Sequence, residues 1–174
     1  MEGRKERRMV ALKVVNIKEF MNLFLRTELF DHFLMSEGSI CTYMTYVLDG
    51  RANREFFSPE DAEYETLKEE YIPFSMVRPT CFELIKGRRT PISFKFVFLL
   101  SGQNQEKTLE SLHSSFSGED ISGMYLNLRY QDGQAFITTG ISYRMFSMDK
   151  SLEQAWDEMI QRFLKGHGIA CEIC

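Results

Sequence analysis

The sequence is poor in the features that most often identify a function. No apolar run approaches the roughly 20 residues that span a membrane, so no membrane partner is expected. Only four cysteines and four prolines occur in 174 residues, which excludes a disulfide scaffold and a proline-rich disordered chain. No signal peptide is recognisable, because the basic start runs into a short, broken apolar stretch. We therefore expect reduced thiols and a cytoplasmic location.

Motifs of the common enzyme classes are also missing. The sequence has no G-x-S-x-G elbow, no H-E-x-x-H zinc site, no P-loop and no G-x-G-x-x-G loop. Its three histidines, at positions 32, 113 and 167, lie near no nucleophile motif. We predict no catalytic residue and no cofactor, and the balance favours a protein that is not an enzyme.

Charge is spread unevenly along the chain. The formal net charge is −4, so the basic field of a nucleic-acid-binding protein is missing from the whole. Residues 2–8 are basic, residues 51–71 are acidic, and residues 76–95 are basic again. Local basic patches therefore stay open as binding sites, and nucleic acid stays open as a partner.

The length predicts one domain. We place it at residues 9–168, between a basic extension over residues 1–8 and a short tail over residues 169–174. Met9 follows the basic octapeptide directly and is a candidate start. Fifteen phenylalanines in a chain that is 44% hydrophobic are enough to build a sizeable core.

Hydrophobic periodicity predicts the elements of the first half. A strand is expected at 10–15, and Asn16 is placed to cap a helix over 17–26. Further strands are expected at 30–36, 39–48 and 51–57, the last two joined by a turn at Asp49-Gly50. A charged helix from Pro59 to about Glu70 follows, with Ser58 as its expected N-cap.

The second half shows a similar order. The expected elements are a short strand at 71–74, a helix at 76–86 capped by Ser75, a central strand at 91–100, a short helix at 106–112, a hairpin of 123–130 and 134–140 turning at Asp132-Gly133, and strand residues 141–146. An amphipathic helix over 151–165 carries Trp156 on its apolar stripe. That stripe packs on the sheet or against a second subunit, so a homo-oligomer remains open.

The order strand–helix–strand–strand–strand thus occurs twice, over residues 10–57 and 71–146. This predicts class α+β, with a mostly antiparallel sheet and the C-terminal amphipathic helix added to it. The duplicated order resembles one domain of a DNA sliding clamp, in which two helices face the DNA and the sheets lie outside. The resemblance implies a sliding-clamp-like fold.

Three stretches carry a second resemblance. They are residues 48–56 (LDGRANREF), 78–91 (RPTCFELIKGRRTP) and 126–130 (LNLRY). They are similar to a family of uncharacterised Firmicutes proteins, a domain of unknown function. The resemblance implies a bacterial protein and supplies no catalytic residue.

Two polar groups are the candidate ligand-binding residues. Arg51, Asn53 and Arg54 follow the expected turn, and Lys86, Arg88 and Arg89 follow the second core helix. If the fold brings Arg51, Arg54, Arg88 and Arg89 together, they form an anion site of a small enzyme or a ligand-binding protein. The second group alone is a candidate contact for nucleic acid.

His167, Cys171 and Cys174 have a spacing compatible with three zinc ligands. A structural zinc site needs a fourth ligand, so we predict no metal. Taken together, the sequence favours a non-enzymatic binding or assembly module, with an anion-binding enzyme or protein and a nucleic-acid-binding protein as alternatives.

Overall fold

The central strand of the sheet alternates buried and less buried side chains. In the computed structural model, which describes residues 11–174, β5 (Ser93–Leu99) buries Phe94, Phe96 and Phe98 on one face. It pairs antiparallel with β2 (Leu34–Cys41) on one side and with β6 (Ile121–Gln131) on the other. The prediction of a central strand here is confirmed.

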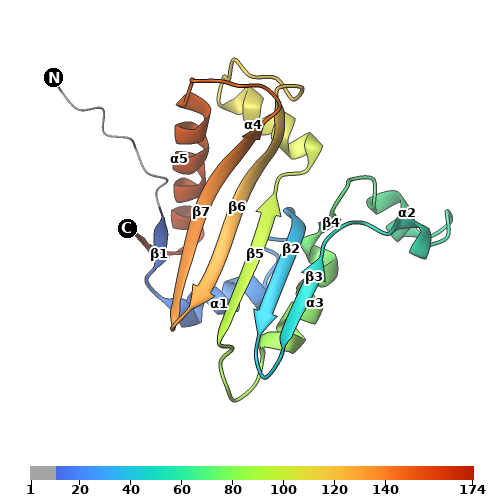
Figure 1. Cartoon of the computed structure of the whole chain (residues 1–174), viewed down its shortest axis with the longest axis vertical. Helices are drawn as coiled ribbons and strands as arrows, with labels where there is room; N and C mark the ends of the chain where they lie inside the picture. Colours follow the sequence, from blue (N-terminus) through green and yellow to red (C-terminus); the bar gives the residue numbers. More distant parts are fainter. Residues whose placement is uncertain (1–10) are drawn as a thin grey trace.

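The described strands form a single sheet in the order β3-β2-β5-β6-β7-β1-β8, and β4 also pairs with β2 (Figure 1). All of the pairs are antiparallel. The remaining strands are β1 (Leu12–Val14), β3 (Thr45–Asp49), β4 (Ile72–Pro73), β7 (Gln134–Tyr143) and β8 (Cys171–Ile173). The two edges of the sheet are therefore β3 with β4, and β8.

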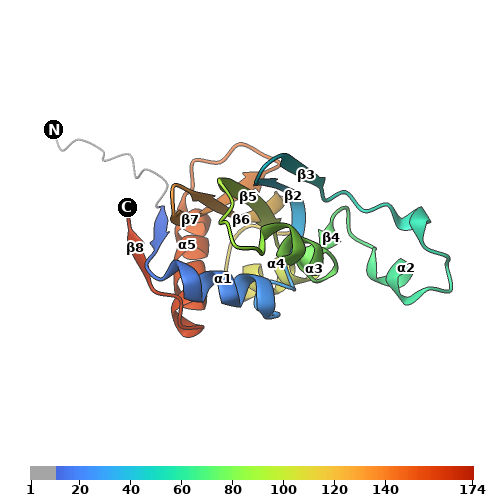
Figure 2. The ribbon, with the colours of Figure 1, turned by 90° about the horizontal axis from the view of Figure 1, so that it is seen from below.

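Helices cover one face of this sheet (Figure 2). They are α1 (Ile17–Arg26), α3 (Phe74–Ile85), α4 (Gly102–Ser111) and α5 (Ser151–Gly166). Among residues 11–174, no helix lies over the opposite face, which we call the open face. Cross-strand neighbours on the open face include Lys95, Arg129, Phe136 and Lys13, in that order.

A phenylalanine cluster fills the space between α1, α3 and the sheet. Phe24 of α1 stacks on Phe74 of α3 with ring centroids 5.2 Å apart, and meets Phe96 of β5 edge-to-face. Its fully buried members are Phe20, Phe24, Phe30, Phe74, Phe94, Phe96 and Phe98. Such aromatic pairs add to the free energy gained from area burial alone. The class α+β prediction is confirmed.

Local signals located several elements correctly. The Asn16 side chain accepts a hydrogen bond from the Glu19 amide, so α1 begins where its cap predicted. Asp132 and Gly133 both have positive φ, as a tight two-residue hairpin turn requires. α5 buries Trp156, whose indole N–H donates to the Tyr125 carbonyl at 2.9 Å.

The first predicted hairpin is wrong in its register. Residues 39–48 do not form one strand, because β2 ends at Cys41 and the chain turns at 42–44 into β3. Asp49-Gly50 is therefore not the hairpin turn. Residues 51–57 are not a returning strand either, and the 3-10 helix η1 (Arg54–Phe56) lies there. Alternation continues across the true turn, which contains no glycine or proline to mark it.

Other boundaries also moved. Residues 30–33 precede β2 rather than forming a strand. The charged helix predicted for 59–70 shortens to α2 (Ala62–Thr66), with Asp61 rather than Ser58 as its N-cap. α3 begins at Phe74, with Pro73 rather than Ser75 as its N-cap, so Pro79 lies inside the helix. α4 starts earlier than predicted because Ser101 caps it by accepting from the Asn104 amide.

The duplicated clamp-like layout is not confirmed. The third strand of the first half is missing from residues 51–57, and the described strands form one sheet. Residues 171–173 of the predicted tail pair with β1 as β8. The basic extension predicted at residues 1–8 lies outside the described residues.

Candidate functional site

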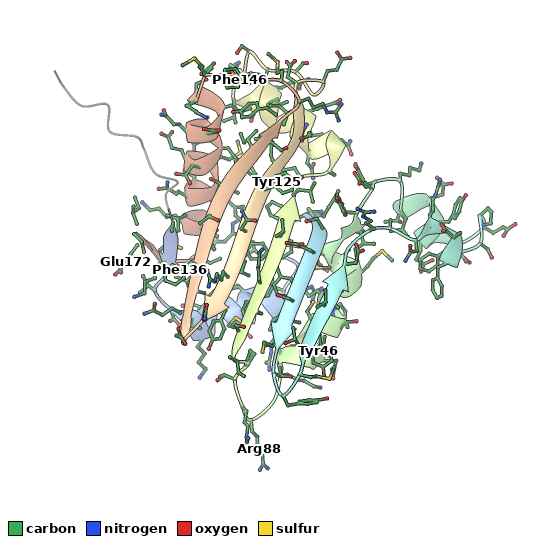
Figure 3. The ribbon with its side chains drawn as sticks, in the orientation of Figure 1. Tyr46, Arg88, Tyr125, Phe136, Phe146 and Glu172 are labelled. Carbon is green, nitrogen blue, oxygen red and sulfur yellow. The ribbon has the colours of Figure 1, made fainter. Side chains whose placement is uncertain are left out.

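The six predicted site residues fall into two groups at opposite ends of one sheet edge. Ser93, which follows the loop of Lys86, Arg88 and Arg89, pairs with Cys41, and Cys41 pairs with Thr45 at the start of β3. Arg51, Asn53 and Arg54 follow the other end of β3. A five-residue strand is roughly 17 Å long. Figure 3 shows Arg88 at the tip of its loop, away from the segment that follows β3. The structure therefore does not join Arg51 and Arg88 into one anion site.

Residues 51–71 form an arm that interrupts the edge strand (Figures 1 and 2). β3 pairs with residues 37–41 of β2, and β4 continues along the same side at Leu34 and Met35. The arm leaves the sheet between these two pieces. Main-chain hydrogen bonds close its base, from the Ala52 amide to the Glu70 carbonyl and from the Ile72 amide to the Gly50 carbonyl, each at 2.9 Å. The arm is thus an insertion held at its stem.

The interior of the arm is held by Arg54. Its guanidinium lies 3.9 Å from the centre of the Tyr64 ring, and its Nε donates to the Tyr64 carbonyl at 2.9 Å. Through these two contacts with Tyr64, the Arg54 side chain stabilises the arm. Leu67 is buried, whereas Phe56 is 82% exposed. The arm therefore has an internal contact between Arg54 and Tyr64 and an aromatic ring on its surface.

The arm is also strongly acidic. It contains three cationic and seven anionic residues, so its formal charge equals the −4 of the whole chain. One exposed ion pair joins Lys68 to Glu65, and this hydrogen bond lowers the pKa of Glu65. The remaining carboxylates are Glu55, Glu60, Asp61, Glu63, Glu69 and Glu70. A surface of this kind attracts a cationic partner.

At the other end of β3 lies a surface that we call the basic end, made of the turn 42–44 and the loop 86–92. The Ile92 amide donates to the Cys41 carbonyl at 2.8 Å and holds the loop beside the turn. Tyr43 is 89% exposed and Ile92 is 67% exposed. The basic end therefore combines cations with uncovered apolar side chains.

The cations of the basic end differ in their contacts. Lys86 pairs with Glu83 at 2.8 Å and lies over the Phe82 ring. Arg88 and Arg89 are exposed, and the ion pairs found within residues 11–174 include neither of them. Their guanidinium groups are available to an anionic partner.

Between the arm and the basic end, one edge of β3 pairs with no other strand of residues 11–174. The Thr42 amide bonds to the Met44 carbonyl, and the Gly50 amide bonds to the Ser36 carbonyl. Because hydrogen-bonded and non-bonded pairs alternate in an antiparallel ladder, the main-chain groups of Thr45, Val47 and Asp49 point away from β2. The Val47 side chain is 78% exposed.

A polar cleft of about 880 Å³ lies near the base of the arm. Its walls include Glu70, Tyr71 and Tyr125, and burial followed by the nearby Tyr71 and Glu70 raises the pKa of Tyr125. Glu69 in its wall accepts from the Gly102 amide at 2.9 Å, at the beginning of α4. These oxygens suit a cationic group. Sequence reasoning missed the cleft because its residues come from five distant segments.

A second, more apolar groove of about 660 Å³ lies between α5 and the β8 edge, lined by Leu12, Leu164 and Ile173 among others. The candidate zinc ligands lie in this region. On β8, side chains alternate between the two faces, so Cys171 and Cys174 point to opposite sides. His167 Nδ1 lies 2.8 Å from the Phe163 carbonyl. Within residues 11–174, no three His, Cys, Asp or Glu side chains are grouped to hold a metal ion.

Comparison with known proteins identifies the family. The family of unknown function DUF5721 matches residues 23–172, which is most of the chain. This chain belongs to DUF5721. The matched range of the DUF5721 chain includes the arm, β3, the basic end and the polar cleft. No curated protein and no solved structure matches it. Across the part of the chain that the structure describes, each helix is too short or too polar to traverse a bilayer.

Proposed function

We propose that the DUF5721 chain is a non-enzymatic binding and assembly module that engages a protein partner through its arm and its basic end. The observation that carries this proposal is the arm itself, an insertion that projects from the sheet edge with Phe56 82% exposed. Aromatic side chains are enriched at protein interfaces, and this one lies on a segment that projects from the domain. The arm adds little to the core, so its conformation serves a contact outside the domain.

Charge supports the same proposal. The acidic arm and the exposed Arg88 and Arg89 of the basic end carry opposite charges, and each is accompanied by uncovered apolar side chains. Aromatic residues and arginine are the types most often enriched at protein interfaces. Rim charges steer association and select partners, while the apolar groups contribute more of the affinity.

The cysteines fit an intracellular module. All four are free thiols in the structure. This supports the reducing, bacterial cytoplasmic setting that we propose for this module.

Photo-cross-linking tests the proposal. We expect a photoactivatable phenylalanine at position 56, in cells that make the protein naturally, to give a discrete protein adduct on irradiation. The same group at Lys107, an exposed position of α4 outside both surfaces, is the matched control. Adducts at neither position, or equal labelling from both, would contradict a docking role for the arm.

A further inference from the structure

We infer that the partner is a second copy of this chain, bound by antiparallel pairing of β3 with β3 so that each arm reaches the basic end of the other copy. This inference rests on the proposed function and names the partner of the same surfaces. It joins three features that lie along one edge of the sheet, the arm, the free edge of β3 and the basic end (Figure 1).

The free edge of β3 supplies the contact. Within residues 11–174, the main-chain donors and acceptors of Thr45, Val47 and Asp49 are unpaired, which is the usual template for adding a strand. Natural edge strands are commonly protected by lysine, proline or a bulge. β3 has none of these, and its outermost apolar side chain, Val47, is 78% exposed.

A two-fold axis through the middle residue of β3 sets the register of the proposed pair. A two-fold axis perpendicular to the sheet and through the middle of the pair sets Val47 opposite Val47 of the second copy. Thr45 then lies opposite Asp49 of the second copy, so the two carboxylates do not face each other. Because Val47 is the middle residue of β3 and its main chain points outward, the two copies would exchange a pair of hydrogen bonds there.

The same rotation brings the charged surfaces together. It exchanges the two ends of β3, so the arm beyond Asp49 of one copy reaches the Thr45 end of the other. The basic end, with Arg88, Arg89 and the exposed Tyr43, lies at that end. Within one molecule these surfaces lie at opposite ends of the strand, so their opposite charges are matched only between copies.

Closure by a two-fold axis also limits the assembly. The contact is isologous, since each copy contributes the same strand, arm and basic end. In one dimer the β3 edges of both copies are paired with each other, so neither can add a third copy. An arm binding a basic end without strand pairing would instead build an open, head-to-tail chain of copies.

Position 47 gives a sharp test because it faces itself across the axis. We expect the full-length protein to have twice the 20.4 kDa chain mass by light scattering at micromolar concentration. Val47→Lys and Val47→Glu each place two like charges opposite each other, and each should weaken the dimer by about tenfold or more. An equimolar mixture of the two should recover the dimer, because lysine then faces glutamate. Val47→Thr is the matched control that keeps the dimer.

Results at this position can overturn the inference directly. A wild-type protein that stays monomeric at about 100 µM would contradict it, as would single variants that keep the dimer mass. Because Val47 is exposed, circular dichroism should show an unchanged fold in every variant.

A double variant of the basic end tests its contact with the arm. The Arg88→Glu, Arg89→Glu double variant should form a weaker dimer, and rising salt should weaken the wild-type dimer in the same direction. Unchanged dimer affinity in this variant would remove the arm from the interface.

The outcomes separate this inference from the proposed function. A cross-linked adduct from position 56 whose mass is not twice that of the chain would preserve the binding module and overturn the second copy as partner. A monomer that binds single-stranded DNA through Arg88 and Arg89 would overturn both.

Discussion

At the scale of single residues, the pair of Arg78 and Asp31 joins α3 to the segment between α1 and β2. Arg78 Nε and Nη2 donate to the two Asp31 oxygens at 2.8 and 3.0 Å, and the side chains are 20% and 10% exposed. The hydrogen bond to Asp31 raises the pKa of Arg78 against the opposing effect of burial. Two parallel bonds of this kind fix geometry as well as charge.

We expect Arg78→Ala to lower the free energy of unfolding by about 3 kcal/mol, because it leaves the Asp31 carboxylate nearly buried and without its partner. Urea denaturation measures this loss. Lys150→Ala is the matched control, since its ion pair with Glu153 is exposed and contributes less than about 0.5 kcal/mol. Equal losses in the two variants would contradict a structural role for the Arg78 pair.

Cys81 makes stability depend on pH. Burial raises the pKa of its thiol from 9.0 to about 12. Between pH 9 and pH 12 the Cys81 thiol is deprotonated in the unfolded chain and protonated in the folded chain. The stabilising effect of burying the neutral thiol is therefore complete below pH 9 and is lost as the pH rises toward 12.

We expect wild type to lose about 1.4 kcal/mol more stability than Cys81→Ala between pH 8 and pH 10. Urea unfolding at both pH values measures the difference. The raised pKa of Tyr143, which is about 12, affects both proteins alike and cancels in the comparison. Parallel pH profiles for the two proteins would show that Cys81 ionises equally in both states.

At the scale of elements, Gly50 determines where the arm leaves the sheet. A Cβ at this position would lie 1.7 Å from the Met35 carbonyl oxygen and 2.7 Å from its carbon. Both atoms belong to the main chain of β2, so no side-chain rotation can relieve the clash. Glycine is therefore required here for close approach, although its place in the sequence beside Asp49 is typical of a hairpin turn.

We expect Gly50→Ala to lower the free energy of unfolding by about 3 kcal/mol, since the junction of β2, β3 and the arm must shift. Faster hydrogen exchange of the Ala52 and Ile72 amides would locate the damage at the arm stem. Gly140→Ala is the control, because nothing lies within 4 Å of a Cβ there. An equally mild effect at both glycines would contradict this account.

Elements with strong local signals were predictable. α1 has a cap and an apolar stripe, β6 and β7 have an Asp-Gly turn between alternating residues, and α5 has a continuous stripe. The arm was not predictable, because residues 51–57 alternate like a strand. The residues that close its base, Glu70 and Ile72, lie at the other end of the arm in the sequence. The six candidate site residues belong to two separate surfaces, and their separation depended on the register of β3.

At the scale of the whole molecule, the two oppositely charged surfaces and the exposed strand lie along one edge of the sheet. The acidic arm and the basic end lie at the two ends of the same exposed edge, and the helices cover only one face of the sheet (Figures 1 and 2). In the proposed pair, each of these surfaces meets the oppositely charged surface of the second copy. A symmetric pair would continue the sheet across both copies, with the helices of each on the same side.

The sequence by itself determined the class of the fold, the central strand, the aromatic core, the capped helix α1 and the amphipathic helix α5. These depend on periodicity and on contacts within a few residues, which a sequence displays directly. The tertiary structure alone decided that β1 and β8, from opposite ends of the chain, lie side by side, that residues 51–71 project as an arm, and that Arg51 and Arg88 are far apart. Strand order and register depend on which distant surfaces bury the most apolar area together, and no local pattern records that choice.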